Sequence, residues 1–166
     1  MPPWVNPLGI SRAVIINSLR AAVATVASML LSRSLKLPEF YWAPISTIVV
    51  LLSTVKPQTV AWQRFVGTAL GAALGALIAT FLHPTWVVYG AGIFVCGILC
   101  ALLRIGTAYR FAAITFSIVL LIAHTRPPWI VALHRFVEVS LGIAVALVVA
   151  VVWPAPAANG STIESA

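Results

Sequence analysis

Three arginines lie within or at the start of long apolar stretches, where a charged side chain is costly to keep. Arg20 is roughly two helical turns inside the first stretch, and Arg64 and Arg135 each lie near the start of a later one. A charge in the centre of a membrane costs about 2.5–3.5 kcal/mol even on mild insertion scales, so it usually has a function. A guanidinium stays charged at any physiological pH and binds a carboxylate through two parallel hydrogen bonds. These arginines predict an anion-binding site, with Arg20 as the leading residue.

Each arginine also has a structural interpretation. Arg64 and Arg135 could anchor helix ends by extending towards lipid phosphates, and Arg20 could have an internal structural partner. If they bind substrate, we expect Arg64 and Arg135 at opposite faces of the membrane, one on each route to its centre. This expectation depends on the sequence repeat described below.

Glu138 is the one acidic residue that a membrane-spanning stretch could bury, and it is a candidate for proton coupling. His134 lies four residues before it and Arg135 three before it, so the three share one face of a helix. His134 would then act as a proton relay, because imidazole exchanges protons near neutral pH. The plainer interpretation, which the sequence favours, is an Arg135–Glu138 pair near the membrane surface.

The apolar stretches predict six membrane-spanning helices. A span needs about 20 apolar residues, and lipid offers the backbone no hydrogen bonds, so spans are helices or closed barrels. The hydrophobicity here is continuous rather than alternating, which favours helices. The expected helices cover about 13–31, 42–55, 60–82, 86–103, 111–123 and 130–153.

The second and fifth stretches are short. Each has about 14 residues, or roughly 20 Å at 1.5 Å per residue, against about 30 Å of hydrocarbon. Short segments at matching positions in two halves of a transporter point to its binding site. Aromatic and hydroxyl side chains there complete the candidate substrate-binding set: Tyr41, Trp42, Ser46, Thr47, Phe111, Thr115 and Ser117. Alternatively, the hydroxyls bond back to carbonyls of their own helices.

The chain repeats itself at an offset of 71 residues, so that Arg64-Phe65-Val66 matches Arg135-Phe136-Val137. Three spans per repeat force the two copies to insert in opposite orientations, and inverted repeats are typical of transporters. We therefore predict an all-α membrane protein of two inverted three-helix repeats. The expected boundaries are a single transmembrane domain at 1–154, with repeats at about 13–82 and 84–153, and a disordered polar tail at 155–166.

Gly67, Gly71 and Gly75 recur every four residues and form one flat stripe on the third helix. Such a stripe lets another backbone approach closely. Its partner could be another helix of this chain or a second copy, and the sequence leaves this open. Because one six-helix module has little interior, we predict a homo-oligomer, most simply a two-fold dimer.

The composition excludes several other classes. Hydrophobic residues make up 61% of the chain and charged residues 8%, whereas a soluble domain has about 25% charged residues. The net charge of +7 suits anionic lipids and anionic substrates. The basic residues are spread through spans and short loops, so no nucleic-acid binding is expected. We also expect no enzyme, cofactor or metal, because no nucleophile–base set, metal cluster or phosphate-binding loop appears.

Two motifs and the end of the last helix resemble a known family. They are Pro38-Glu39-Phe40-Tyr41-Trp42-Ala43-Pro44, Arg64-x-x-Gly67-Thr68-x-x-Gly71-x-x-x-Gly75 and Trp153-Pro154. Together they resemble the membrane domain of the fusaric-acid-resistance and aromatic acid exporter family over nearly the whole chain. The resemblance implies a six-helix module of the bacterial inner membrane that exports aromatic or other organic acids, often with a periplasmic adaptor subunit. Many members carry two such modules and a cytosolic domain, so self-association is expected here.

We therefore predict an exporter of small organic anions, especially aromatic carboxylates, driven by the proton gradient. A passive organic-anion channel and a non-transporting membrane assembly subunit are the alternatives. The basic residues divide five against four between the two sides, so the positive-inside rule does not decide the orientation. The expectation that both termini are cytoplasmic depends mainly on the family resemblance.

Overall fold

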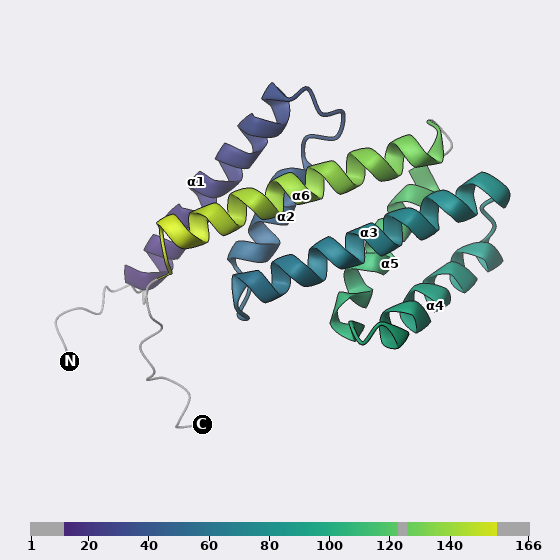
Figure 1. Ribbon diagram of the computed structural model, residues 1–166. Coiled ribbons are helices and arrows are strands. Elements are labelled where there is room, and N and C mark those ends of the chain that lie inside the picture. The colour runs from purple at the N-terminus through teal and green to yellow at the C-terminus, as the bar shows by residue number, and fades with distance from the viewer. Residues whose placement is uncertain (1–11, 123–125, 156–166) are drawn as a thin grey trace.

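The structure is a computed structural model that describes residues 12–122 and 126–155, and this part of the chain is helical without strands. Figure 1 shows its six α-helices. Their bounds are α1 Arg12–Ser34, α2 Trp42–Leu51, α3 Pro57–Phe81, α4 Trp86–Leu102, α5 Tyr109–Ile122 and α6 Pro128–Val152, with a short 3-10 helix, η1, at Gly106–Ala108. Within the described residues, the prediction of an all-α chain with six α-helices is confirmed. That all six of them cross a membrane stays a prediction. The predicted disordered tail lies, from residue 156 onwards, outside the described residues.

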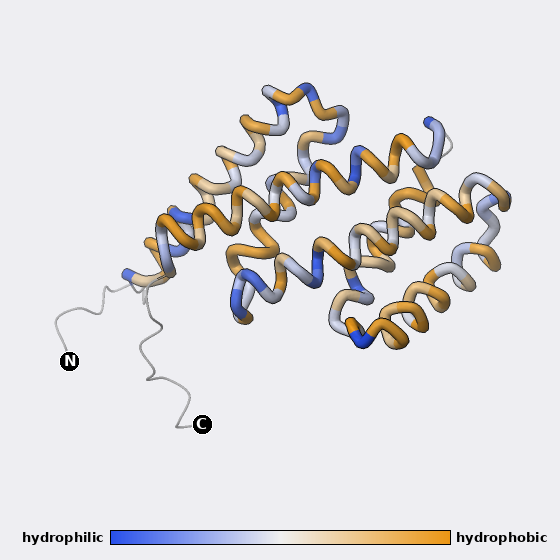
Figure 2. The backbone as a smooth tube through the Cα atoms, in the orientation of Figure 1, coloured by the Kyte–Doolittle hydropathy of each residue, from blue (hydrophilic) through white to orange (hydrophobic). Residues whose placement is uncertain are grey.

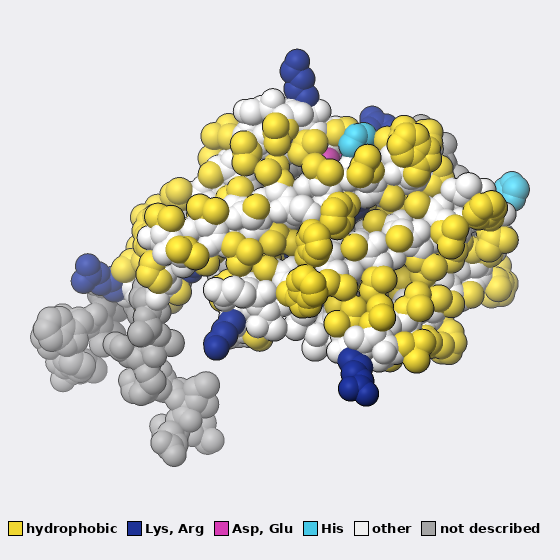
Figure 3. Space-filling model, viewed as in Figure 1, with side chains coloured by type: hydrophobic (Ala, Val, Ile, Leu, Met, Phe, Trp, Pro, Cys, Tyr) yellow, Lys and Arg dark blue, Asp and Glu magenta, His cyan; other side chains and the backbone are white. Residues whose placement is uncertain are grey.

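Three of the helices are long and apolar enough to cross a membrane: α1, α3 and α6. The other three are shorter apolar helices, and α2 has only 10 residues, which gives about 15 Å of rise. Figure 2 shows hydrophilic positions gathered mainly at the connections. Figure 3 shows hydrophobic side chains covering most of the visible face, with lysines and arginines at its edges. This surface fits a protein that is surrounded by lipid.

Equivalent helices of the two halves begin and end in the same way. Both α3 and α6 begin at a proline, Pro57 and Pro128, whose missing N–H is harmless in the first helical turn. Both α1 and α4 end at a basic residue in the left-handed region, Lys36 with φ 52° and Arg104 with φ 57°. The amide that follows each donates to the carbonyl five residues earlier, at 3.1 and 2.9 Å. This is the hydrogen bond of a Schellman cap, and it closes both helices.

The packing of the helices also repeats between the two halves of the chain. Helices α3 and α6 lie side by side and antiparallel at the centre (Figure 1), with α5 packed on α3 and α2 packed on α6. Helix α1 covers α2 and α6, and α4 covers α5 and α3. Within the described residues, exchanging α1, α2 and α3 for α4, α5 and α6 maps every contacting pair of α-helices onto a contacting pair, with α3–α6 mapped onto itself. Superposition of the two halves by a two-fold axis in the membrane plane stays a prediction.

The buried positions recur with two different offsets. The buried residues of α3 are Val60, Ala61, Arg64, Gly67, Thr68, Gly71, Ala72 and Gly75, and those of α6 follow the same pattern 71 residues later. Five buried positions of α2 recur in α5 after 69 residues instead. The gapless match at 71 residues therefore pairs the short helices incorrectly. Burial makes Thr115, and not Ser117, the equivalent of Ser46.

The glycine stripe of α3 packs against α5 of the same chain. A methyl group at Gly71 would overlap the backbone of Ala112, and one at Gly75 would press on Val119. The equivalent Gly142 of α6 meets the carbonyl of Ala43 on α2 in the same way. The stripe's partner is therefore another helix of this chain, so the stripe does not support the predicted dimer.

Candidate functional site

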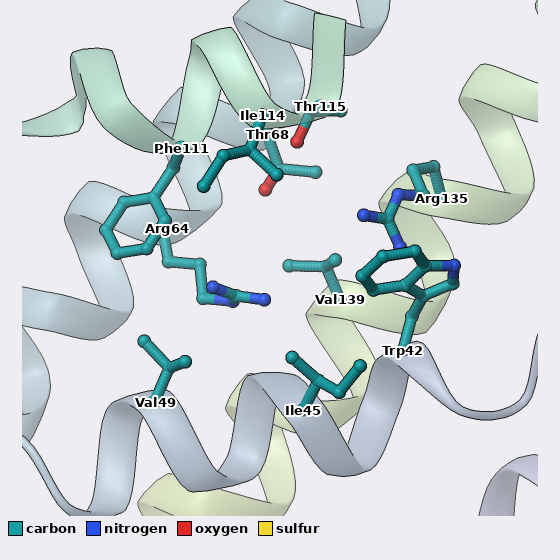
Figure 4. Close-up of a pocket in the computed structure, with 10 residues that line it drawn as sticks. All are labelled: Trp42, Ile45, Val49, Arg64, Thr68, Phe111, Ile114, Thr115, Arg135 and Val139. Carbon is teal, nitrogen blue, oxygen red and sulfur yellow. The ribbon is translucent and has the colours of Figure 1, made fainter. Parts of the chain in front are cut away.

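A cavity of about 280 Å³ lies where α2, α3, α5 and α6 meet (Figure 4). Its lining is mostly apolar and contains two arginines and two threonines. The lining residues are Trp42, Ile45, Val49, Arg64, Thr68, Phe111, Ile114, Thr115, Arg135 and Val139. Five of these residues are candidates named from the sequence. Four of the five form pairs at equivalent positions of the two repeats, Arg64 with Arg135 and Trp42 with Phe111, so both halves of the chain build the cavity.

Arg64 and Arg135 are both buried, with 8% and 2% of their surfaces exposed. Figure 4 shows their guanidiniums entering the same space from α3 and α6. The expectation that they lie at opposite membrane faces is therefore wrong. Each arginine is seven residues into its helix, about 10 Å from the start. Because the two helices are antiparallel and adjacent, their long side chains converge on the middle from opposite directions.

Each guanidinium lies over an aromatic ring. Arg64 Cζ is 5.1 Å from the ring centre of Phe111, and Arg135 Cζ is 3.2 Å from that of Trp42. Such contacts hold a cation in place without using its N–H groups. Within the described residues, Nε of Arg64 and both Nε and Nη1 of Arg135 are buried without a hydrogen-bond partner. A bound carboxylate could accept hydrogen bonds from these N–H donors.

The two ends of the cavity differ in charge. Arg64 has like charges as its electrostatic neighbours, Arg110 and Arg135. Arg135 instead has Glu39 and Glu138 as its strongest electrostatic neighbours. The positive potential is therefore less compensated at Arg64 than at Arg135.

Glu138 does not pair with Arg135 as the sequence favoured, because no carboxylate of the described residues lies within ion-pair distance of that guanidinium. Glu138 is fully buried, and its Oε1 accepts a hydrogen bond of 3.0 Å from the backbone N–H of Glu39. Its Oε2 is buried without a partner in the described part of the chain. The guanidinium of Arg135 is held over Trp42, whereas Glu138 is directed to the turn before α2. The proton relay through His134 stays a prediction.

The hydroxyl groups fall into two sets. Ser46, Thr47 and Ser117 each donate to the backbone carbonyl four residues earlier, at 2.9, 3.1 and 2.7 Å, as the back-bonding interpretation expects. Thr47 Oγ1 also lies 3.0 Å from the carbonyl oxygen of Gly142 on α6, and Ser117 Oγ lies 3.0 Å from the hydroxyl of Tyr89 on α4. Thr115 lines the cavity and makes no hydrogen bond to the described residues. Thr68, which sequence reasoning missed as a site residue, does the same. Its position one turn after Arg64 on the same helical face was the available signal.

Like Ser46, Thr47 and Ser117, two further candidates are not among the residues that line the cavity. Arg20 is buried on α1, with 4% of its surface exposed, but it is not among the residues that line the cavity. Tyr41 is 45% exposed and packs beside Trp42, with ring centres 5.3 Å apart. Because they line the cavity, Arg64 and Arg135 replace Arg20 as the leading candidates for anion binding. The apolar lining that sequence reasoning missed consists of Ile45, Val49, Ile114 and Val139.

Three helices are long and apolar enough to cross a membrane, and two of them, α3 and α6, help to line a cavity that holds two buried arginines. These features indicate a membrane protein with an internal candidate site. The chain belongs to the fusaric acid resistance protein-like family, whose profile matches residues 25–149. This family suggests a membrane protein of the transport or resistance type. Searches of curated proteins and of solved structures find no match to the chain.

Proposed function

We propose that the protein transports small organic anions, especially aromatic carboxylates, and that the central cavity binds the substrate. The observation that carries this proposal is the pair of buried arginines in one cavity, each on an aromatic ring and each with at least one buried N–H group that has no hydrogen-bond partner among the described residues. A buried cation without a partner is costly. An anionic ligand would satisfy it.

The cavity has the character that a small aromatic acid needs. Its carboxylate would bind Arg64 or Arg135 through two hydrogen bonds, with Thr68 and Thr115 as further donors. Its ring would lie against the apolar lining. The volume of about 280 Å³ lies at the lower end of ligand pockets, which span about 300–1,000 Å³. An acid with a single ring is therefore the size class that we propose.

Transport requires two states that open the cavity to either side in turn, and inverted repeats provide them. The antiparallel α3 and α6 and the exchangeable helix contacts support such repeats. We propose export driven by the proton gradient, with Glu138 as the proton carrier, because its buried carboxylate has one oxygen without a partner in the described residues.

The family supports the remaining assignments. We propose the bacterial inner membrane as the location, with both termini in the cytoplasm. We also propose a homodimer and, as a further partner, a periplasmic adaptor subunit.

The test is uptake of benzoate into protein-containing liposomes, with and without a pH gradient and at clamped voltage. We expect pH-driven uptake by the wild type and none by the double variant Arg64→Gln/Arg135→Gln. Arg33→Gln is the matched control, because Arg33 also lies over a ring, that of Phe40 at 4.5 Å, but on the exposed end of α1. Flux that depends on voltage and ignores the pH gradient would select a channel. Absence of wild-type flux would select the non-transporting subunit.

A further inference from the structure

We propose that a second anion-binding site lies in an open hollow beside Arg110 and delivers carboxylates to Arg64. The identity of the ligand rests on the proposed function, but the site itself does not. The hollow has a volume of about 380 Å³. It is lined by Val55, Gln63, Gly106, Thr107, Tyr109 and Arg110. These residues lie at the end of the bundle that carries the α2–α3 and α4–α5 connections.

One aromatic ring links this outer hollow to the central cavity. Arg110 Cζ lies 4.8 Å from the ring centre of Phe111, and Arg64 Cζ lies 5.1 Å from the same centre. The two guanidiniums are therefore within about 10 Å of each other. Arg110 lines the hollow, whereas Arg64 and Phe111 line the cavity. A carboxylate that leaves Arg110 needs to move only about one side-chain length to reach Arg64.

The charge around this ring is uncompensated. Within the described residues, no carboxylate lies within ion-pair distance of Arg64 or Arg110, and each is a like-charged neighbour of the other. Two cations held this close repel each other, so an anion between them is favoured. Gln63, Thr107 and Tyr109 add neutral side-chain donors at the rim of the hollow.

The same end of the bundle attracts anions at longer range. Lys56 and Arg104 lie in the two connections next to the hollow, and neither described acid is there, because Glu39 and Glu138 neighbour Arg135 instead. A surface of one sign raises the local concentration of the opposite charge and its rate of capture.

The other half of the molecule lacks this arrangement. At the 69-residue offset of the short helices, the equivalent of Arg110 is Tyr41, which carries no positive charge. The carboxylates near Arg135 also repel an anion that approaches from that side. This asymmetry cannot drive transport, which needs an energy source. It does make the half-saturation concentration lower for substrate that approaches from the Arg110 side.

The test is benzoate uptake by Arg110→Gln in liposomes of neutral phosphatidylcholine, with Lys56→Gln as the control. Lys56 is a basic residue at the same end that does not line the hollow. For Arg110→Gln we expect the half-saturation concentration to rise about tenfold, in line with loss of electrostatic capture, with the maximal rate within about twofold. Its dependence on ionic strength should also weaken. Arg110→Lys, which keeps the charge, should restore most of the affinity.

Three results would overturn the site. They are equal half-saturation for Arg110→Gln and Lys56→Gln, an effect of Arg110→Gln that appears only with anionic lipid, and a fall in maximal rate alone. The second result would assign the hollow to lipid headgroups. If the wild type shows no flux, the proposed transport function fails, and benzoate binding to the purified protein decides the site separately. Binding weakened by Arg110→Gln but not by Lys56→Gln supports it, and equal binding by the two variants rejects it.

Discussion

Replacing Arg64 by glutamine should weaken substrate affinity strongly while leaving the fold intact. Arg64 is 8% exposed, and no carboxylate of the described residues lies within ion-pair distance of it. Its substitution therefore leaves no buried acid without a counterion. Breaking a buried ion pair costs about 3–5 kcal/mol, and that cost does not arise here. The loss is limited to the cation–aromatic contact with Phe111, at about 0.5–2 kcal/mol.

Removing a buried charge that has no carboxylate partner among the described residues offsets part of this loss. We therefore expect the free energy of unfolding to change by no more than about 1 kcal/mol, or roughly 2–4 °C in Tm. Loss of charge-assisted hydrogen bonds to the substrate, at about 1.5–3 kcal/mol, corresponds to a rise of about 10- to 150-fold in half-saturation concentration. Function and stability should thus separate.

Arg135→Gln is the contrasting variant. It removes the cation that neighbours Glu39 and Glu138 and the close contact with Trp42, so we expect it to lose about 1–3 kcal/mol of stability as well as flux. The measurements are thermal unfolding in detergent and benzoate uptake at matched protein levels. Wild-type affinity for benzoate in Arg64→Gln would refute the assignment. A large fall in its Tm, equal to that of Arg135→Gln, would refute the difference between the two ends.

Three further predictions test the packing and the coupling. Gly71→Ala should lower stability by about 1–3 kcal/mol through overpacking against α5, whereas Gly90→Ala, where nothing lies within 4 Å of an added methyl, should be neutral or slightly stabilising; equal Tm values would contradict this. Glu138→Gln keeps an oxygen to accept the N–H of Glu39 and should fold, but its flux should no longer follow a pH gradient; unchanged pH-driven accumulation would exclude Glu138 as the carrier. Arg20→Ala should keep flux close to wild type, because Arg20 does not line the cavity, and loss of flux in a folded variant would return the leading role to Arg20.

The helices and their ends follow from local sequence patterns. The apolar stretches predict helices at about 60–82 and 130–153, and α3 and α6 begin two to three residues earlier, at Pro57 and Pro128, because proline is well tolerated in the first turn of a helix. The 71-residue offset also predicts their common burial pattern. The 69-residue offset of α2 and α5 was missed. An identical residue at the 71-residue offset, such as Ser46 and Ser117, does not show which face of each helix is buried.

The sequence predicts only part of the candidate site. Sequence gives the depth of a residue along its helix but not the neighbour that it faces. Of the arginines and threonines named from the sequence, Arg64, Arg135 and Thr115 line the cavity, whereas Arg20, at a comparable depth, does not. That Arg64 and Arg135 meet in one place depends on the antiparallel packing of α3 and α6, which no local pattern encodes.

One position explains why the two halves differ despite their common packing. Gly67 of α3 allows the chain at Ala108 to approach closely, whereas its equivalent in α6 is Glu138, which accepts a hydrogen bond from Glu39. Ala108 and Glu39 are themselves equivalent at the offset of the short helices. The same junction is therefore closed by direct backbone contact in one half and through a carboxylate in the other. Only the carboxylate junction can respond to a proton, because protonation turns a charged acceptor into a donor. A protein with two identical junctions would bind protons on both sides or on neither. This single difference confines proton coupling, if Glu138 performs it, to the half that contains Arg135.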